Sequence, residues 1–289
     1  MPTSSSAGSL SARLLALLCL ILAMISVQVG AAYATHLFGR IGPEGTTGLR
    51  CGFSALVLVL FWRPWRGGLS GKAALAALLY GLSLGCMNMC FYLSLEHLPL
   101  GVAVAVEFSG PLVLALISSR RPMDFLWIAL ALAGLAGLSP LSAASRHLST
   151  TGLLLALAAG ACWAAYIIFG KRVVRTMPGN RASALGMLVA ALLSAPFAVV
   201  HAGTDLLAPS VLTAAFVVSL LSSTIPYSLE MVSLKRLSAK TFSIVVSLEP
   251  AVAAASGWAV NGEHLSPLQM TCMAALTVAS LGCTASSRS

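Results

Sequence analysis

Two carboxylates lie beside prolines inside long apolar stretches of the chain. Glu107 occurs in the sequence AVEFSGP and Glu249 in SLEP. A carboxylate facing hydrocarbon costs at least ~2.5 kcal/mol, so each is expected to face a protein interior or a water-filled cavity. There it attracts cations and can exchange a proton near neutral pH. The pair predicts a transport site inside a membrane. The alternative is a carboxyl group that is protonated or bonded to the backbone.

Other polar side chains are placed to complete such a site. Asn88 and Tyr92 continue a stripe of small residues at helical spacing, and both can donate hydrogen bonds into a cavity. Gln28 stands on a comparable face of the first apolar stretch. Trp163 fits two interpretations equally, a cavity wall or an anchor at the membrane interface.

Two charged residues each fit two roles. Arg50 is the only basic residue placed to reach a substrate carboxylate, and the alternative is that it snorkels to the outer interface. Glu230, in PYSLEM, lies about one turn from the cytoplasmic end of its stretch and either joins the site or pairs with Lys235. The substrate-binding and proton-binding candidates are therefore Glu107, Glu249, Glu230, Asn88, Tyr92, Gln28, Arg50 and Trp163.

The charges favour an amine or a zwitterion as substrate over a phosphorylated compound, which would require clustered Arg or Lys. The sequence contains no Walker-type loop and no GxSxG or HExxH motif, so we expect neither an enzyme nor an ATP-driven pump, and no catalytic residue. Cys86 and Cys90 lie one helical turn apart and would suit Cu(I), but thiols on apolar helices more often serve packing. We therefore predict no metal site.

The elements that position these residues are apolar helices. The 289 residues are 58% hydrophobic and 9% charged, with a mean hydropathy of +0.93, which indicates a polytopic membrane protein. Reading stretches of roughly 20 apolar residues as spans predicts about ten. They are 13–36, 44–62, 72–95, 99–118, 123–141, 151–170, 182–200, 209–233, 240–260 and 266–283.

The basic residues set the expected topology. Most of the 17 lysines and arginines fall at one set of span ends if the N-terminus is inside, which is the positive-inside pattern. Both termini are therefore predicted to be cytoplasmic. The net charge of +9 serves this topology, and we expect no nucleic-acid partner. The first apolar run is longer than a signal-peptide core, so it is predicted to remain as an uncleaved span.

The chain also repeats itself. A gap-free shift lays Pro111 on Pro250, Val106 on Val245 and Ser83 on Ser222. The two halves, residues 12–145 and 149–284, would each contain five spans, and an odd number inverts the second half relative to the first. Pro111 and Pro250 are predicted helix breaks that free backbone carbonyls near the bilayer midplane, where cavity water or protein can satisfy them.

Longer segments resemble a known family. They include FYLSLEHLPLGVAVAVEFSGPLVLAL (91–116), SSRRPMDF (118–125), GACWAAYII (160–168), PYSLEM (226–231) and RLSAKTFSIVVSLEPAVAAASG (236–257). The chain is similar here to the threonine/homoserine exporters of the EamA branch of the drug/metabolite transporter superfamily.

The resemblance implies an all-α inner-membrane protein of ten helices in two inverted repeats. It also implies export of threonine, homoserine and related amino acids by proton antiport, with the proton as coupling ion and no other cofactor. The expected partners are the amino acid and the lipid bilayer, and the protein would be a monomer or homodimer. Two alternatives remain at this stage: a drug or metal cation exporter of the same fold, and a non-transporting membrane sensor.

Overall fold

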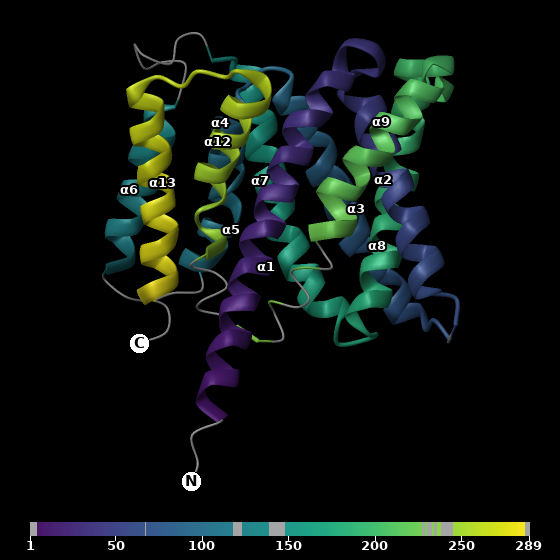
Figure 1. Cartoon of the computed structure of the whole chain (residues 1–289), viewed down its shortest axis with the longest axis horizontal. Helices are drawn as coiled ribbons and strands as arrows, with labels where there is room; N and C mark the ends of the chain where they lie inside the picture. The colour runs from purple at the N-terminus through teal and green to yellow at the C-terminus, as the bar shows by residue number, and fades with distance from the viewer. Residues whose placement is uncertain are drawn as a thin grey trace.

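The protein is helical throughout the part of the chain that the structure describes. A computed structural model describes residues 5–66, 68–117, 123–138, 148–226, 229, 233, 236–237 and 245–286, and these residues contain no β-strand. The helices run roughly side by side (Figure 1). An α-helix pairs most of its backbone groups within its own segment, as a membrane interior demands.

The first half of the chain begins with two long helices joined by a short 3₁₀ turn. Its elements are α1 (Ser5–Ala34), η1 (Thr35–Leu37), α2 (Phe38–Trp62), α3 (Gly71–Leu95), α4 (Leu100–Glu107), α5 (Ser109–Ile117) and α6 (Met123–Gly137). Within α2, Gly42 has a φ of 66° and Pro43 follows it, so this helix is kinked near its start. A positive φ is a conformation that glycine adopts at little cost.

The second half of the chain is also built of helices of different lengths. Its elements are α7 (Thr150–Val173), α8 (Gly179–Ala202), η2 (Gly203–Leu207), α9 (Pro209–Ser219), η3 (Leu220–Thr224), α12 (Glu249–Asn261) and α13 (Pro267–Ser286). The helices of both halves lie close to the predicted apolar stretches. The start of the predicted stretch 240–260 lies outside the described residues.

In the described part of the chain, four helical runs are long and apolar enough to cross a membrane, judged by length and composition: Leu14–Trp62, Gly71–Leu95, Thr150–Val173 and Gly179–Leu207. Shorter apolar helices accompany them at Leu100–Leu114, Phe125–Gly137, Pro209–Thr224 and Pro267–Gly282. The predicted all-α architecture of apolar helices is therefore confirmed for the described residues.

Most of the packing joins one half of the chain to the other. Helix α2 packs on α8, α3 on α7 and α8, α6 on α13, and α4 and α1 on α12. In Figure 1, α6, α13, α4 and α12 occupy one side of the molecule, and α2, α3, α8 and α9 the other. Helices α1 and α7 run between these two groups. A site at the centre is therefore built from both halves.

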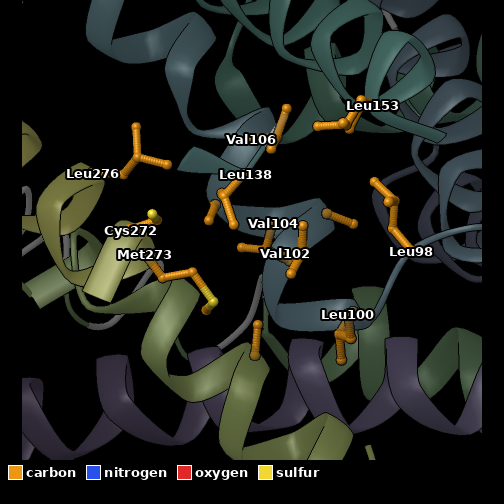
Figure 2. Close-up of a cluster of buried hydrophobic side chains, with 14 of the residues drawn as sticks. Leu98, Leu100, Val102, Val104, Val106, Leu138, Leu153, Cys272, Met273 and Leu276 are labelled. Atoms are coloured by element: carbon orange, nitrogen blue, oxygen red, sulfur yellow. The ribbon is translucent and has the colours of Figure 1, made fainter. Parts of the chain in front are cut away.

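The largest apolar cluster surrounds α4. Every residue of this helix is buried, as expected for a helix that is hydrophobic on all sides. Figure 2 shows the valines of α4 between side chains of α13 on one side and Leu98 and Leu153 on the other. This packing fixes the position of the carboxylate at the end of α4, Glu107.

The helix break after Glu107 is held by close backbone contact. Helix α4 ends at Glu107 and α5 begins at Ser109, with Phe108 in a turn between them. A Cβ added to Gly160 of α7 would lie 2.6 Å from the Glu107 carbonyl oxygen, and one added to Gly110 would overlap the Gly160 backbone. Glycine at both positions lets α7 approach the break closely.

Candidate substrate-binding site

A cavity of about 320 Å³ lies between the two halves of the molecule. Its lining comes from α1, α2, α3, α4, α7, η3 and α12, so elements far apart in sequence build it. Seven of the residues predicted from sequence line it: Gln28, Arg50, Asn88, Tyr92, Glu107, Trp163 and Glu249. The eighth, Glu230, lies outside the described residues.

Arg50 is turned inward. The residue is 9% exposed, and its Nε donates a hydrogen bond to Ser222 Oγ at 2.6 Å. Its two terminal nitrogens donate to Asn88 Oδ1 and, at 3.4 Å, to the Ser222 carbonyl oxygen. The guanidinium carbon lies 5.1 Å from the centre of the Tyr92 ring, within cation–π range. The alternative that Arg50 snorkels to the outer interface is therefore wrong, because buried acceptors hold its guanidinium.

Ser222 belongs to an irregular turn that the sequence did not reveal. It lies in η3, where the helix begun by α9 widens to π-type hydrogen bonding over Leu220–Thr224. Such π-turns are often found at functional sites. The sequence analysis names Ser222 only as the repeat counterpart of Ser83, although several serines recur along this stretch of the chain. That density of serines was the available signal, but it could not identify Arg50 as the partner.

The two carboxylates meet different helix ends. Glu107 is buried and is the last residue of α4, where the negative end of the helix dipole disfavours a negative charge. Glu249 opens α12, with Pro250 in the first turn, where the positive end of the helix dipole favours a negative charge. Gln28 Nε2 donates a hydrogen bond to Glu249 Oε1 at 3.1 Å. The site thus holds two acidic groups whose surroundings differ.

Both predicted prolines stand at interruptions of helical structure. Pro111 has no N–H for the carbonyl of Glu107, and that carbonyl packs against Gly160 instead. Pro250 stands in the first turn of α12, after a turn at Ser247 and Leu248. Each interruption lies beside one of the two carboxylates.

Aromatic rings form the apolar wall. Trp163 meets Phe108 edge to face, with ring centres 5.1 Å apart. Tyr166 stacks on Tyr80 at 4.9 Å, and the Tyr80 hydroxyl donates to the Tyr166 hydroxyl at 3.1 Å. Of the two interpretations of Trp163, the structure supports a cavity wall.

The copper alternative finds no support in the geometry. Cys86 is exposed and Cys90 is only partly buried. Over the described ranges, no group of three or more His, Cys, Asp or Glu residues is placed to hold a metal ion.

Comparison with known proteins identifies the family. A family model described as the EamA-like transporter family matches residues 150–285. Proteins named threonine/homoserine exporter RhtA, from Salmonella typhimurium strain SL1344 and Escherichia coli strain K12, are each 46% identical to the chain over 270 residues. The matches cover 93% of this chain and 91% of each relative. The chain belongs to the EamA-like transporter family.

More distant comparisons agree. The uncharacterized transporter YwfM of Bacillus subtilis strain 168 is 26% identical over 240 residues, which are 78% of this chain and 81% of that protein. A crystal structure with 20% sequence identity covers 96% of both chains with a TM-score of 0.57, and this likeness concerns the fold alone.

Family membership settles two predictions. With its apolar helices, it identifies this EamA-like chain as a multi-pass membrane protein. It also confirms that the chain is a transporter-family protein and not an enzyme.

Proposed function

We propose that this protein exports small amino acids, among them threonine and homoserine, across the bacterial inner membrane by proton antiport. The observation that carries the proposal is the 46% identity, over 93% of the chain, to proteins named threonine/homoserine exporters. The cavity adds chemical support, because groups of both charges line it.

The lining suits a zwitterion. Arg50 offers a guanidinium for the substrate carboxylate, and guanidinium matches the planar geometry of a carboxylate. Glu107 and Glu249 offer acceptors for the substrate ammonium. At ~30 Å³ for each water, a volume of about 320 Å³ corresponds to roughly ten water molecules. That is room for an amino acid of eight heavy atoms with some of its water.

We place this site at the interface of two inverted five-helix repeats, residues 12–145 and 149–284, with both termini cytoplasmic. The packing supports such a two-fold relation. If α1, α2, α3, α4–α5 and α6 correspond to α7, α8, α9, α12 and α13, then α2–α8, α4–α12 and α6–α13 are pairs of equivalent helices. The contact of α1 with α12 is likewise matched by that of α7 with α4. Inverted repeats alternate access by rocking around a central site.

Coupling follows from competition for one carboxylate. We assign the proton to Glu107, because it is buried at a helix C-terminus, whereas Glu249 lies at a helix N-terminus with an amide donor beside it. From the cytoplasm, deprotonated Glu107 binds the substrate ammonium. On the outer side, a proton replaces the ammonium and the amino acid leaves. The proton and the substrate ammonium cannot occupy Glu107 together, so their transport is coupled without a second binding site.

Exchange by the purified protein tests the function. Proteoliposomes loaded with unlabelled threonine should accumulate labelled threonine and homoserine, and a large amino acid such as tryptophan should not compete. Exchange of a lipophilic cation in place of the amino acids would move the assignment to drug efflux. Movement of no solute would favour a membrane sensor.

A further inference from the structure

One buried acceptor in the cavity has no hydrogen-bond partner among the residues that the structure describes. Gln28 is 3% exposed, and its Nε2 is held by Glu249. Its Oε1 makes no hydrogen bond within the described part of the chain, although it is fully shielded. Gln28 lines the cavity. Because buried polar atoms are almost always paired, this oxygen calls for a donor supplied by the cavity's contents.

Most other polar groups around the cavity are already engaged with the protein. Asn88 accepts from Arg50 and donates to the Leu84 carbonyl oxygen at 2.8 Å. Ser222 accepts from Arg50 and donates to the Val218 carbonyl oxygen at 2.6 Å. The Tyr92 ring lies against the Arg50 guanidinium, but the Tyr92 hydroxyl makes no hydrogen bond within the described residues. Gln28 Oε1 differs from the Tyr92 hydroxyl because an amide oxygen can only accept a hydrogen bond, and the bond from Nε2 to Glu249 holds it in place.

A hydroxy amino acid brings one group that the charged residues do not serve. Its carboxylate suits Arg50, and its ammonium suits the glutamates. The side-chain hydroxyl remains, and it needs an acceptor for its proton.

We propose that Gln28 Oε1 accepts the hydrogen bond of the substrate's side-chain hydroxyl and so selects hydroxy amino acids over apolar ones of the same size. The inference rests on the proposed function, because it names the substrate group that this site reads. Glu249 acts as the positioning residue, since its bond to Nε2 turns Oε1 away from itself. The same acceptor serves threonine and the longer homoserine if the flexible side chain of either brings its hydroxyl to Oε1.

A single hydrogen-bond acceptor gives a predictable ratio between the affinities for a hydroxy amino acid and for its methyl analogue. An apolar pocket discriminates poorly between a hydroxyl and a methyl group, whereas a site with a buried hydrogen-bonding atom rejects the methyl analogue because that atom stays unpaired. One neutral acceptor should give a preference of about 10- to 100-fold. The matched pairs are threonine against valine and homoserine against norvaline, which differ by a hydroxyl in place of a methyl group.

The test measures these two ratios in proteoliposomes, by competition of each amino acid against labelled threonine. Wild-type protein should favour the hydroxy compound of each pair about 10- to 100-fold. Gln28→Met keeps the side-chain length but removes the amide, and it should bring both ratios to within about threefold of unity. The matched control is Gln269→Met. Gln269 is also buried, but its Oε1 accepts from the Ser266 N–H at 2.8 Å and it does not line the cavity. This variant should keep the wild-type ratios.

Several outcomes would overturn the proposal. If the wild type exchanges labelled threonine but threonine and valine compete equally, the proposed role of Gln28 is refuted. The proposed function as an exporter is not affected by that result. Unchanged ratios in Gln28→Met would show that Gln28 Oε1 does not recognise the hydroxyl. If Tyr92→Phe, and not Gln28→Met, loses the preference for the hydroxy compound, the hydroxyl is recognised by Tyr92. If Gln28→Met does not fold, the wild-type ratios and Tyr92→Phe still decide. Absence of labelled threonine exchange in the wild type would refute the proposed function itself.

Discussion

Replacing Arg50 should separate recognition of the substrate carboxylate from recognition of its amine. Arg50→Met keeps an unbranched stem but removes the guanidinium and the three bonds that link it to Asn88 and Ser222. An ion pair at about 4 Å in surroundings of effective dielectric constant ~20 contributes roughly 4 kcal/mol. Arg50→Met should therefore weaken threonine binding by up to about 1,000-fold.

Arg50→Lys gives an intermediate case. Lysine keeps the charge but concentrates its donors on one nitrogen, so it cannot bond Asn88 and Ser222 as the planar fork does. Loss of one charge-assisted hydrogen bond costs about 1.5–3 kcal/mol. That corresponds to threonine binding about 10- to 150-fold weaker than in the wild type.

Calorimetric titration in detergent measures both variants, with threonine and with its decarboxylated analogue 1-aminopropan-2-ol. Only threonine should lose affinity, because the analogue has no carboxylate to bind. Arg40→Met is the matched control, since Arg40 is exposed and bonds Ser210 at 2.8 Å outside the cavity lining. Threonine binding at wild-type affinity by folded Arg50→Met would refute the assignment of Arg50.

Three further changes test other parts of the account. Glu107→Gln should retain slow threonine exchange but abolish threonine-driven proton movement, measured with a pH-sensitive dye inside proteoliposomes; coupling at the wild-type stoichiometry would contradict the proton assignment. Gly160→Ala brings a Cβ to 2.6 Å from the Glu107 carbonyl oxygen and should lower the melting temperature, whereas Gly52→Ala, with open space around it, should not; equal melting temperatures would show that the close contact is unimportant. Joint replacement of Cys86 and Cys90 by serine should leave threonine exchange within about twofold of wild type, and a large loss would revive a role for the thiols.

Much of the candidate site could be inferred from sequence because buried charge is costly. Glu107 and Glu249 stood out as carboxylates in apolar stretches, and the structure brings both to one cavity. The prolines indicated where regular helix would stop, and the breaks occur there. These inferences needed only local chemistry and the depth of a residue along a helix.

What the sequence could not supply is which side chains meet. Arg50 has the same local pattern whether it snorkels outward or turns inward, and only the position of Ser222 on η3 decides between them. The open acceptor of Gln28 depends on Glu249, 221 residues away. The contact between Gly110 and Gly160 joins α5 to α7 across the two halves. Contacts between residues this far apart in sequence arise from tertiary packing, which helical periodicity and hydropathy do not predict.

The most direct test of the central claim is threonine-driven proton movement by the purified wild-type protein in proteoliposomes with a pH-sensitive dye inside. The account predicts that threonine and homoserine gradients drive protons in the opposite direction, and that tryptophan and a lipophilic cation do not. Proton movement driven by the lipophilic cation alone, or amino-acid transport with no accompanying proton movement, would contradict it.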